Sequence, residues 1–89
     1  MNKKRNRLEV IKDILEVLKK NRETKITHII YKANLSNNSI KPYIANLLTN
    51  GLIKENNRED KKLFILTEKG LSFLEEFDKI KIFSDSYGL

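Results

Sequence analysis

The chain has no cysteine and no tryptophan, and it contains one histidine and one proline among 89 residues. Without cysteine there is neither a disulfide nor a thiolate metal site, and His28 alone does not make a zinc site. No run of about 18 consecutive apolar residues is present, so the sequence shows neither a membrane span nor a cleavable signal peptide. We therefore expect an intracellular protein that binds no metal, and nothing in the sequence indicates a cofactor.

Patterns typical of an active site are also missing. The acidic group Glu75, Glu76 and Asp78 has no partner histidine or nucleophile. The sequence therefore predicts a binding protein rather than an enzyme. A chain of 89 residues and 10.5 kDa forms one domain with an adequate but small core, so pairing with a second copy would add stability.

Acidic residues are scarce in the first part of the chain. Residues 1–54 hold 12 Lys or Arg against 4 Asp or Glu, whereas residues 55–89 hold 6 against 8, and the net charge is +6. This concentration of positive charge favours a polyanion partner, because each neutralised phosphate releases condensed counterions. The alternative is a solvated lysine-rich surface, which is common in soluble proteins. The pattern of elements must decide between the two.

The stretch from Asn37 to Asn50 is the most informative part of the sequence. Wound as a helix, it has one apolar side, and its other side is small and polar without an acid. A solvated helix face would be rich in Glu and Lys, whereas Asn and Ser are able to reach base edges in a major groove. We therefore predict a DNA-binding protein that reads the major groove with this helix; the alternative is an ordinary exposed face in an Asn-rich sequence. The apolar side consists of Ile40, Tyr43, Ile44, Leu47 and Leu48, and the predicted base or phosphate contacts are Asn38, Ser39, Lys41, Ala45, Asn46 and Thr49.

The preceding segment has the spacing of a helix-turn-helix. Residues 1–7 are predicted to be a flexible basic arm, and residues 8–20 a deeply buried helix. After a short strand at residues 25–26, Thr27 is predicted to cap a second, short helix. The three-residue turn 33–35, in which Asn34 is expected to adopt a left-handed conformation, then leads into the helix that would read DNA.

The start of that helix has two candidate caps, Ser36 and Ser39. Inside a helix, Pro42 lacks an amide donor and clashes with the preceding turn, at a cost of about 3 kcal/mol. A cap at Ser39 places Pro42 in the tolerant first turn, whereas a cap at Ser36 predicts a bend near Asn38. Asn50-Gly51 ends the helix, because glycine readily adopts the left-handed conformation that follows a last turn.

The second half of the chain predicts a β-hairpin and one more helix. Two short strands, residues 52–55 and 62–66, flank the polar segment 56–61, which would form a charged tip. A helix follows over about residues 68–83, and the tail 84–89 is expected to fray.

Three helices, a β-hairpin and a C-terminal helix are the order of a winged helix-turn-helix, an α+β fold that is mostly α, here over residues 8–83. Three runs also resemble an archaeal winged-helix family: Tyr-Lys-Ala-Asn-Leu-Ser at residues 31–36, the segment 43–53 ending in Gly-Leu-Ile, and Leu-Thr-Glu-Lys-Gly at residues 66–70. This family includes small transcriptional regulators, some of them viral, and the 10a-type DNA-binding proteins of Sulfolobus. The resemblance implies double-stranded DNA binding by a homodimer in which the last helix pairs with its copy. Because our predicted last helix is shorter than that of the 10a-type proteins, we do not expect a long rod.

The hairpin, or wing, and the arm supply further candidate DNA contacts. Cations in the wing would reach phosphates or a neighbouring minor groove, although Glu59 and Asp60 at its tip oppose this. The arm would either lie in a minor groove or be only a solubilising start. The candidates are Lys54, Arg58, Lys61 and Lys62 in the wing, and Lys3, Lys4 and Arg5 in the arm.

Apolar residues in the last helix predict a dimer interface. Phe73, Phe77, Ile80 and Phe83 exceed what a small domain needs for its own core, and the alternative is that they pack only within the domain. The net negative charge of the C-terminal half would keep DNA away from this surface.

Together these patterns predict a cytoplasmic, nucleoid-associated transcriptional regulator that binds double-stranded DNA as a homodimer. A variant in the same class is an architectural chromatin protein of low specificity. An alternative from another class is a winged-helix module whose third helix binds protein, but the basic arm and the acid-free helix face argue against it.

Overall fold

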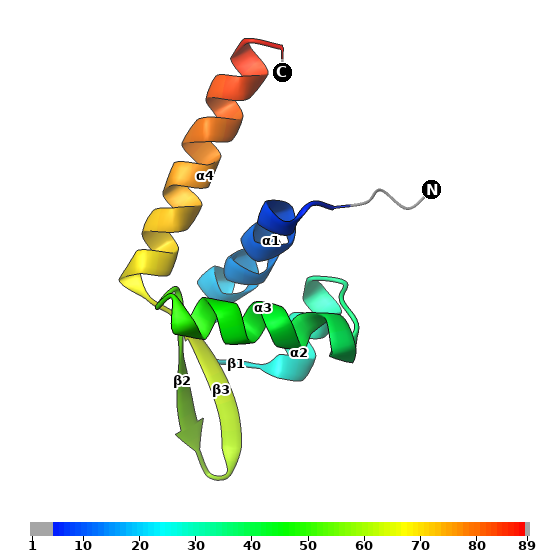
Figure 1. The fold of residues 1–89 in the computed structure, drawn as a ribbon. Helices are drawn as coiled ribbons and strands as arrows, with labels where there is room; N and C mark the ends of the chain where they lie inside the picture. The colour runs from blue at the N-terminus through cyan, green and yellow to red at the C-terminus, as the bar shows by residue number, and fades with distance from the viewer. Residues whose placement is uncertain (1–4, 89) are drawn as a thin grey trace.

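The computed structural model describes residues 5–88 and has the predicted order of elements (Figure 1). Three helices pack together beside a small antiparallel sheet whose strand order is β1-β3-β2, and the hairpin and α4 extend to opposite ends of the molecule. Within the described part of the chain, no helix is both long and apolar enough to cross a membrane. The elements are α1 (Arg7–Lys20), β1 (Thr24–Lys25), α2 (Ile26–Lys32), α3 (Asn37–Thr49), β2 (Ile53–Arg58), β3 (Lys61–Leu66) and α4 (Glu68–Ser86).

The hydrophobic core lies between α1, the other helices and one face of the sheet. Helix α1 is deeply buried as predicted, with Ile14 and Leu15 fully enclosed, although Leu8 near its start is exposed. Phe64 from β3 and Leu74 from α4 fill the same cluster. Burial of these large side chains is the main favourable contribution to stability.

The prediction of a flexible arm over residues 1–7 is wrong for residues 5–7. Asn6 caps α1 and forms a capping box with Glu9, so the helix begins at Arg7. The Arg5 guanidinium donates hydrogen bonds to an Asp13 carboxylate oxygen at 2.7 Å and to the carbonyl oxygens of Ala33 and Asn34 at 2.6 and 2.8 Å. Arg5 therefore ties the start of the chain to the helix-turn-helix turn. The remaining predicted arm residues, Lys3 and Lys4, lie outside the described residues.

The turn between α2 and α3 confirms the predicted left-handed conformation at Asn34, whose φ is 55°. The predicted cap of α2 at Thr27 is wrong, because the helix begins at Ile26 with Lys25 in the cap position and no capping side chain. Lys25 is also paired with Leu63 of β3, so the chain passes directly from strand to helix.

Helix α3 takes Ser36, not Ser39, as its cap. The Ser36 hydroxyl accepts a hydrogen bond from the Ser39 amide at 3.1 Å, and the Ser39 hydroxyl accepts one from the Ser36 amide at 3.0 Å. Pro42 is therefore beyond the first turn, and its missing amide removes the usual hydrogen bond to the Asn38 carbonyl. The helix nevertheless runs unbroken to Thr49. A bend near Asn38 stays a prediction.

The predicted six-residue polar tip of the hairpin is wrong, because most of it belongs to the strands. Asn57 pairs with Lys62 and Arg58 with Lys61, leaving a two-residue turn at Glu59 and Asp60. Both turn residues have positive φ, at 51° and 63°. This conformation matches the right-handed twist of the flanking strands and allows the ladder to continue to the tip.

Helix α4 begins close to the end of α3 and is longer than predicted. The approach is close enough that a Cβ at Gly70 would lie 2.2 Å from the Leu52 carbonyl oxygen, so only glycine fits there. The helix continues to Ser86. The prediction that the chain frays from Ser84 is therefore wrong for residues 84–86. Neither glycine nor proline occurs after Gly70 until Gly88, and Ser or Asp alone does not stop a helix.

Candidate nucleic-acid interface

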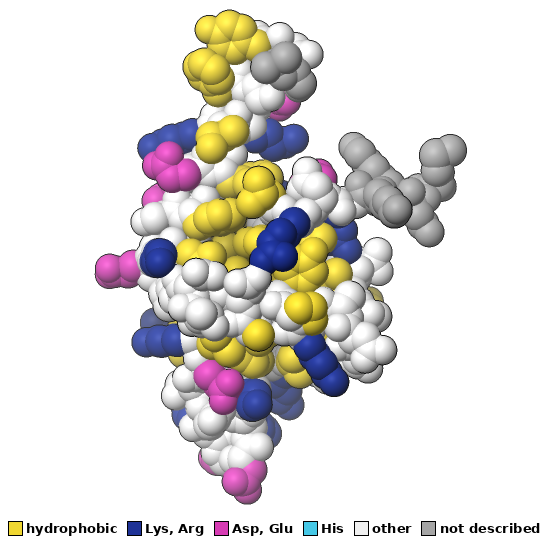
Figure 2. Space-filling model, viewed as in Figure 1, with side chains coloured by type: hydrophobic (Ala, Val, Ile, Leu, Met, Phe, Trp, Pro, Cys, Tyr) yellow, Lys and Arg dark blue, Asp and Glu magenta, His cyan; other side chains and the backbone are white. Residues whose placement is uncertain are grey.

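Helix α3 presents a continuous outer stripe of Asn38, Pro42, Ala45 and Thr49, all exposed. These residues are spaced at i, i+4, i+7 and i+11, which places them on one face of a helix. The opposite face is anchored in the core by the buried Ile40, Ile44 and Leu47. Figure 2 shows a largely uncharged surface over α3. The exposure predicted for this face is therefore present in the free protein.

No acid occurs between Glu23 and Glu55, a segment that contains all of α2 and α3. Lys41 is exposed on the flank of the α3 stripe. A phosphate approaching this face meets amides, hydroxyls and lysine without like-charge repulsion. The arrangement is typical of a surface that fits a polyanion.

Two of the predicted base contacts are already engaged within the protein. The Ser39 hydroxyl belongs to the cap of α3 and donates to the Ser36 carbonyl oxygen at 3.2 Å. Asn46 is half-buried, and its Oδ1 accepts a hydrogen bond from Asn50 Nδ2 at 3.1 Å. Either side chain would have to rearrange before it bonded to a base, whereas Asn38 is exposed with no such constraint shown.

Arg7 lies beside α3, a position that the spacing of residues in the sequence did not predict. Its guanidinium lies 5.9 Å from the centre of the Tyr43 ring, and Arg7 itself is exposed. Arg7 belongs to α1, so only tertiary packing brings it to the flank of α3. The half-buried Tyr43 supports this contact from the core side of α3.

The predicted wing cations divide between the two faces of the hairpin. Lys54, Arg58 and Lys61 share the outer face, because paired residues of an antiparallel ladder point to the same side and neighbours alternate. Lys62 points to the other face with Asn57. All four cations are exposed.

Glu23, which lies just before β1, contacts the wing, and sequence reasoning missed it. It accepts a hydrogen bond from Asn56 Nδ2 at 2.9 Å and forms an ion pair with Arg58. These partners lie 33 and 35 residues away along the chain, so no local signal marks them.

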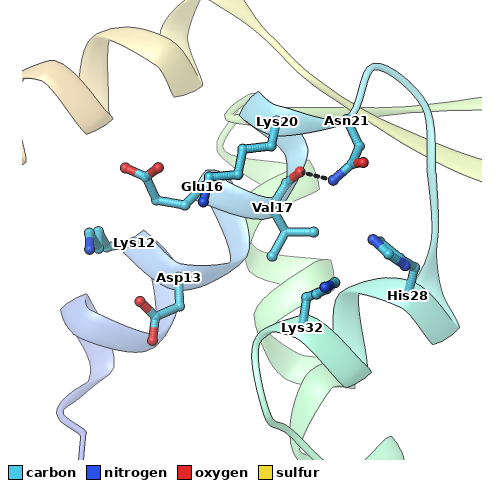
Figure 3. Close-up of a pocket in the computed structure, with 8 residues that line it drawn as sticks. All are labelled: Lys12, Asp13, Glu16, Val17, Lys20, Asn21, His28 and Lys32. Carbon is cyan, nitrogen blue, oxygen red and sulfur yellow. Dashed lines mark hydrogen bonds between the residues drawn. The ribbon is translucent and has the colours of Figure 1, made fainter.

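A groove of about 790 Å³ lies between α1 and α2 (Figure 3). Lys12, Lys20 and Lys32 line it together with Asp13 and Glu16, so charges of both signs face the space. His28 is half-buried at the edge of this groove. The mixed charge gives the groove no preference for an anion over a cation.

The outer half of α4 carries exposed apolar side chains, and Figure 2 shows them gathered at its end. Of the predicted dimer residues, Ile80 and Phe83 are 68% and 63% exposed. Phe73 and Phe77 are half-buried, with ring centres 6.5 Å apart. Tyr87, which the prediction omitted, is 68% exposed and packs its ring against Phe83 at 4.9 Å.

Residues 4–84 match the family model described as winged helix-turn-helix. The chain belongs to the winged helix-turn-helix family. The protein MJ0287 of Methanocaldococcus jannaschii, whose own function is uncharacterised, is 43% identical to this winged helix-turn-helix chain over 67 residues. That match covers 75% of the chain and 64% of the relative. MJ0290 of the same organism is 36% identical over 77 residues, which cover 86% of the chain and 34% of the relative. The chain therefore spans less than two thirds of each of these curated relatives.

Two solved structures are similar to this winged helix-turn-helix chain. Sso10a-2, a DNA-binding protein from Sulfolobus solfataricus, has a TM-score of 0.81 and 27% identity, covering 94% of this chain and 87% of that one. F93 from STIV, a winged-helix DNA-binding protein, has a TM-score of 0.68 and 21% identity, and the match covers 86% of this chain and 90% of F93. The fold and the archaeal winged-helix family predicted from the sequence are confirmed.

Proposed function

We propose that this protein is a dimeric transcriptional regulator that binds double-stranded DNA and lays α3 in the major groove. The observation that carries the proposal is the exposed, acid-free outer stripe of α3 above a buried apolar face. Residues of this kind contact base edges and thymine methyl groups. Sso10a-2 and F93 share the fold, and both are described as DNA-binding. The protein would act on the nucleoid by binding, without catalysis.

The dimer in this proposal forms through α4. Ile80, Phe83 and Tyr87 leave an apolar surface in water that a single domain of this size does not cover. A second copy offers the same surface, and two-fold pairing of one patch is the commonest way for small proteins to associate. Such a pair would present two α3 helices to one duplex.

Selection of bound duplexes from a random pool tests the regulator directly. A regulator enriches a defined sequence, and a two-fold dimer enriches a palindrome whose half-sites lie about one helical turn apart. Failure to retard random duplex even at low salt would contradict DNA binding and favour a protein-interaction module.

An architectural role of low specificity is the second candidate. It is favoured by the intramolecular bonds of Ser39 and Asn46, which leave fewer groups of α3 free to read bases. In that case the same selection recovers no consensus, while binding to every duplex remains strong and salt-dependent.

A further inference from the structure

The Glu23 carboxylate reaches across the sheet to the wing. Glu23 directly precedes β1, which lies at one edge of the sheet, whereas its partners Asn56 and Arg58 lie on β2 at the other edge. Asn56 and Arg58 are two residues apart on β2 and therefore point to the same, outer face. The Glu23 carboxylate thus connects the two edges of the sheet, the start of β1 and strand β2, across the central strand β3.

Leu63 is buried on the outer face of β3, between the two strands that the Glu23 contacts connect. Leu63 is only 8% exposed, although it lies outside the main hydrophobic cluster. It pairs with Lys25 on one side and Asn56 on the other, so it sits on the outer face at the centre of this connection. Glu23, Lys25, Arg58 and Leu63 line a single basin there.

The charges around this basin are mainly positive. Arg22, Lys25, Arg58 and Lys61 line it against Glu23 and Glu59. Glu23 holds the Arg58 guanidinium as a phosphate would, because both present oxygen acceptors with negative charge. The Arg58 side chain is 64% exposed, and ion pairs this exposed are weak enough for a competing anion to replace.

We propose that Glu23 is a positioning residue of the wing, which holds Arg58 in the free protein in the place that a DNA phosphate takes in the complex. This inference rests on the proposed DNA binding. When the wing contacts DNA, Arg58 leaves the Glu23 carboxylate and binds a phosphate instead. Because the ion pair with Glu23 is lost, Arg58 adds less affinity for DNA than an arginine without such a partner would. Glu23 sets how strongly the wing contributes to binding.

Glu23→Gln tests the exchange, because glutamine keeps the shape and one acceptor oxygen but removes the charge. The matched control is Glu75→Gln, which changes the net charge equally on an exposed position of α4, away from the wing. The dissociation constant of each variant for one duplex is measured over a series of salt concentrations. We expect Glu23→Gln to bind several-fold more tightly at low salt and to steepen the salt dependence by about one phosphate contact, whereas Glu75→Gln stays near the wild type.

Arg58→Ala completes a double-mutant cycle. In the Arg58→Ala background, Glu23→Gln should lose most of its gain, since no guanidinium remains to be released. Thermal melts of all variants separate a loss of folding from a change in binding. The wild type gives an independent measurement, because added duplex should shift the NMR signals of the Arg58 guanidinium group.

The outcomes decide the inference separately from the proposed function. Weaker binding by Glu23→Gln, or a salt dependence equal to that of Glu75→Gln, overturns the exchange while leaving DNA binding intact. Arg58 signals that do not respond to duplex overturn it as well, even where Glu23→Gln fails to fold. A wild type that binds no duplex overturns the proposed function and this inference together.

Discussion

The Thr67 hydroxyl donates a hydrogen bond of 2.6 Å to the carbonyl oxygen of Gly51. The same hydroxyl accepts a hydrogen bond from the Gly70 amide at 3.1 Å and thereby caps α4. Lys69 adds a second tie by donating to the Asn50 carbonyl oxygen at 2.7 Å. The end of the proposed recognition helix is therefore fixed to the start of the proposed dimer helix, which would set the distance between two recognition helices.

Thr67→Val should remove this tie while keeping the shape of the side chain. It deletes a helix cap and a hydrogen bond, so we expect the free energy of unfolding to fall by about 1–2 kcal/mol in denaturant titrations. Thr27→Val is the control, because Thr27 is exposed on α2 and its predicted capping role was wrong. An equal loss in both variants would show that the Thr67 bonds add nothing.

Pro42→Ala should stabilise the protein. Alanine restores the amide that the Asn38 carbonyl lacks and removes the proline clash, so a gain of about 1–3 kcal/mol in the free energy of unfolding is expected. Pro42→Gly should gain about 1 kcal/mol less, because glycine is a poorer helix former. A loss of stability in Pro42→Ala would mean that α3 has a geometry to which proline is already suited.

Arg5→Met should destabilise the junction between the start of the chain and the turn after α2. Methionine keeps much of the apolar stem but loses the hydrogen bonds to Asp13, Ala33 and Asn34, at an expected cost of about 1–3 kcal/mol. Chemical denaturation measures the change, with Arg22→Met, at an exposed position, as the control. The prediction fails if Arg5→Met unfolds at the same denaturant concentration as the control.

The sequence was sufficient for features that depend on neighbouring residues. Asn34 adopts the left-handed conformation because a short polar side chain tolerates it, and Gly51 does so after α3 with a φ of 73°. The apolar spacing of α3 likewise predicted which side would be buried. These features need no knowledge of distant partners.

The sequence left a choice open where several local solutions were similar, and it missed features whose partner lay far away in the chain. Ser36 and Ser39 are both good caps, and the reciprocal bonds between them select Ser36 only once the preceding turn is in place. Asn56 and Arg58 have little preference for strands, yet they pair with β3 and bond to Glu23. The role of Arg5 depends on carbonyl groups 28 and 29 residues away.

Asn38→Ala and Lys41→Ala should affect DNA binding in different ways. Asn38 lies on the exposed stripe, so its loss should reduce the preference for the selected sequence over random duplex by about 1–3 kcal/mol. Lys41→Ala should weaken binding to all duplexes alike and reduce the salt dependence by about one contact. Competition binding with selected and random duplexes at two salt concentrations measures both effects. An equal loss on every duplex from Asn38→Ala would contradict base reading by this residue.

The dimer predicts a difference between two exposed isoleucines on α4. Phe77, Ile80, Phe83 and Tyr87 follow one another in steps of three or four residues, so they lie along one side of α4. Ile82 lies about 200° around the helix from Ile80. Both are equally accessible, at 68% and 70%. Ile80→Glu should therefore convert the dimer to a monomer, because it buries an unpaired carboxylate in the interface, while Ile82→Glu should leave it intact.

Sedimentation equilibrium over a range of protein concentrations distinguishes the two variants. The wild type and Ile82→Glu should also show a melting temperature that rises with concentration, since association stabilises the folded state by mass action, whereas Ile80→Glu should not. A wild type that stays monomeric at high concentration would contradict the proposed dimer, and dimers in all three proteins would place the self-association surface elsewhere. In either case the end of α4 would need a different partner to cover its apolar side.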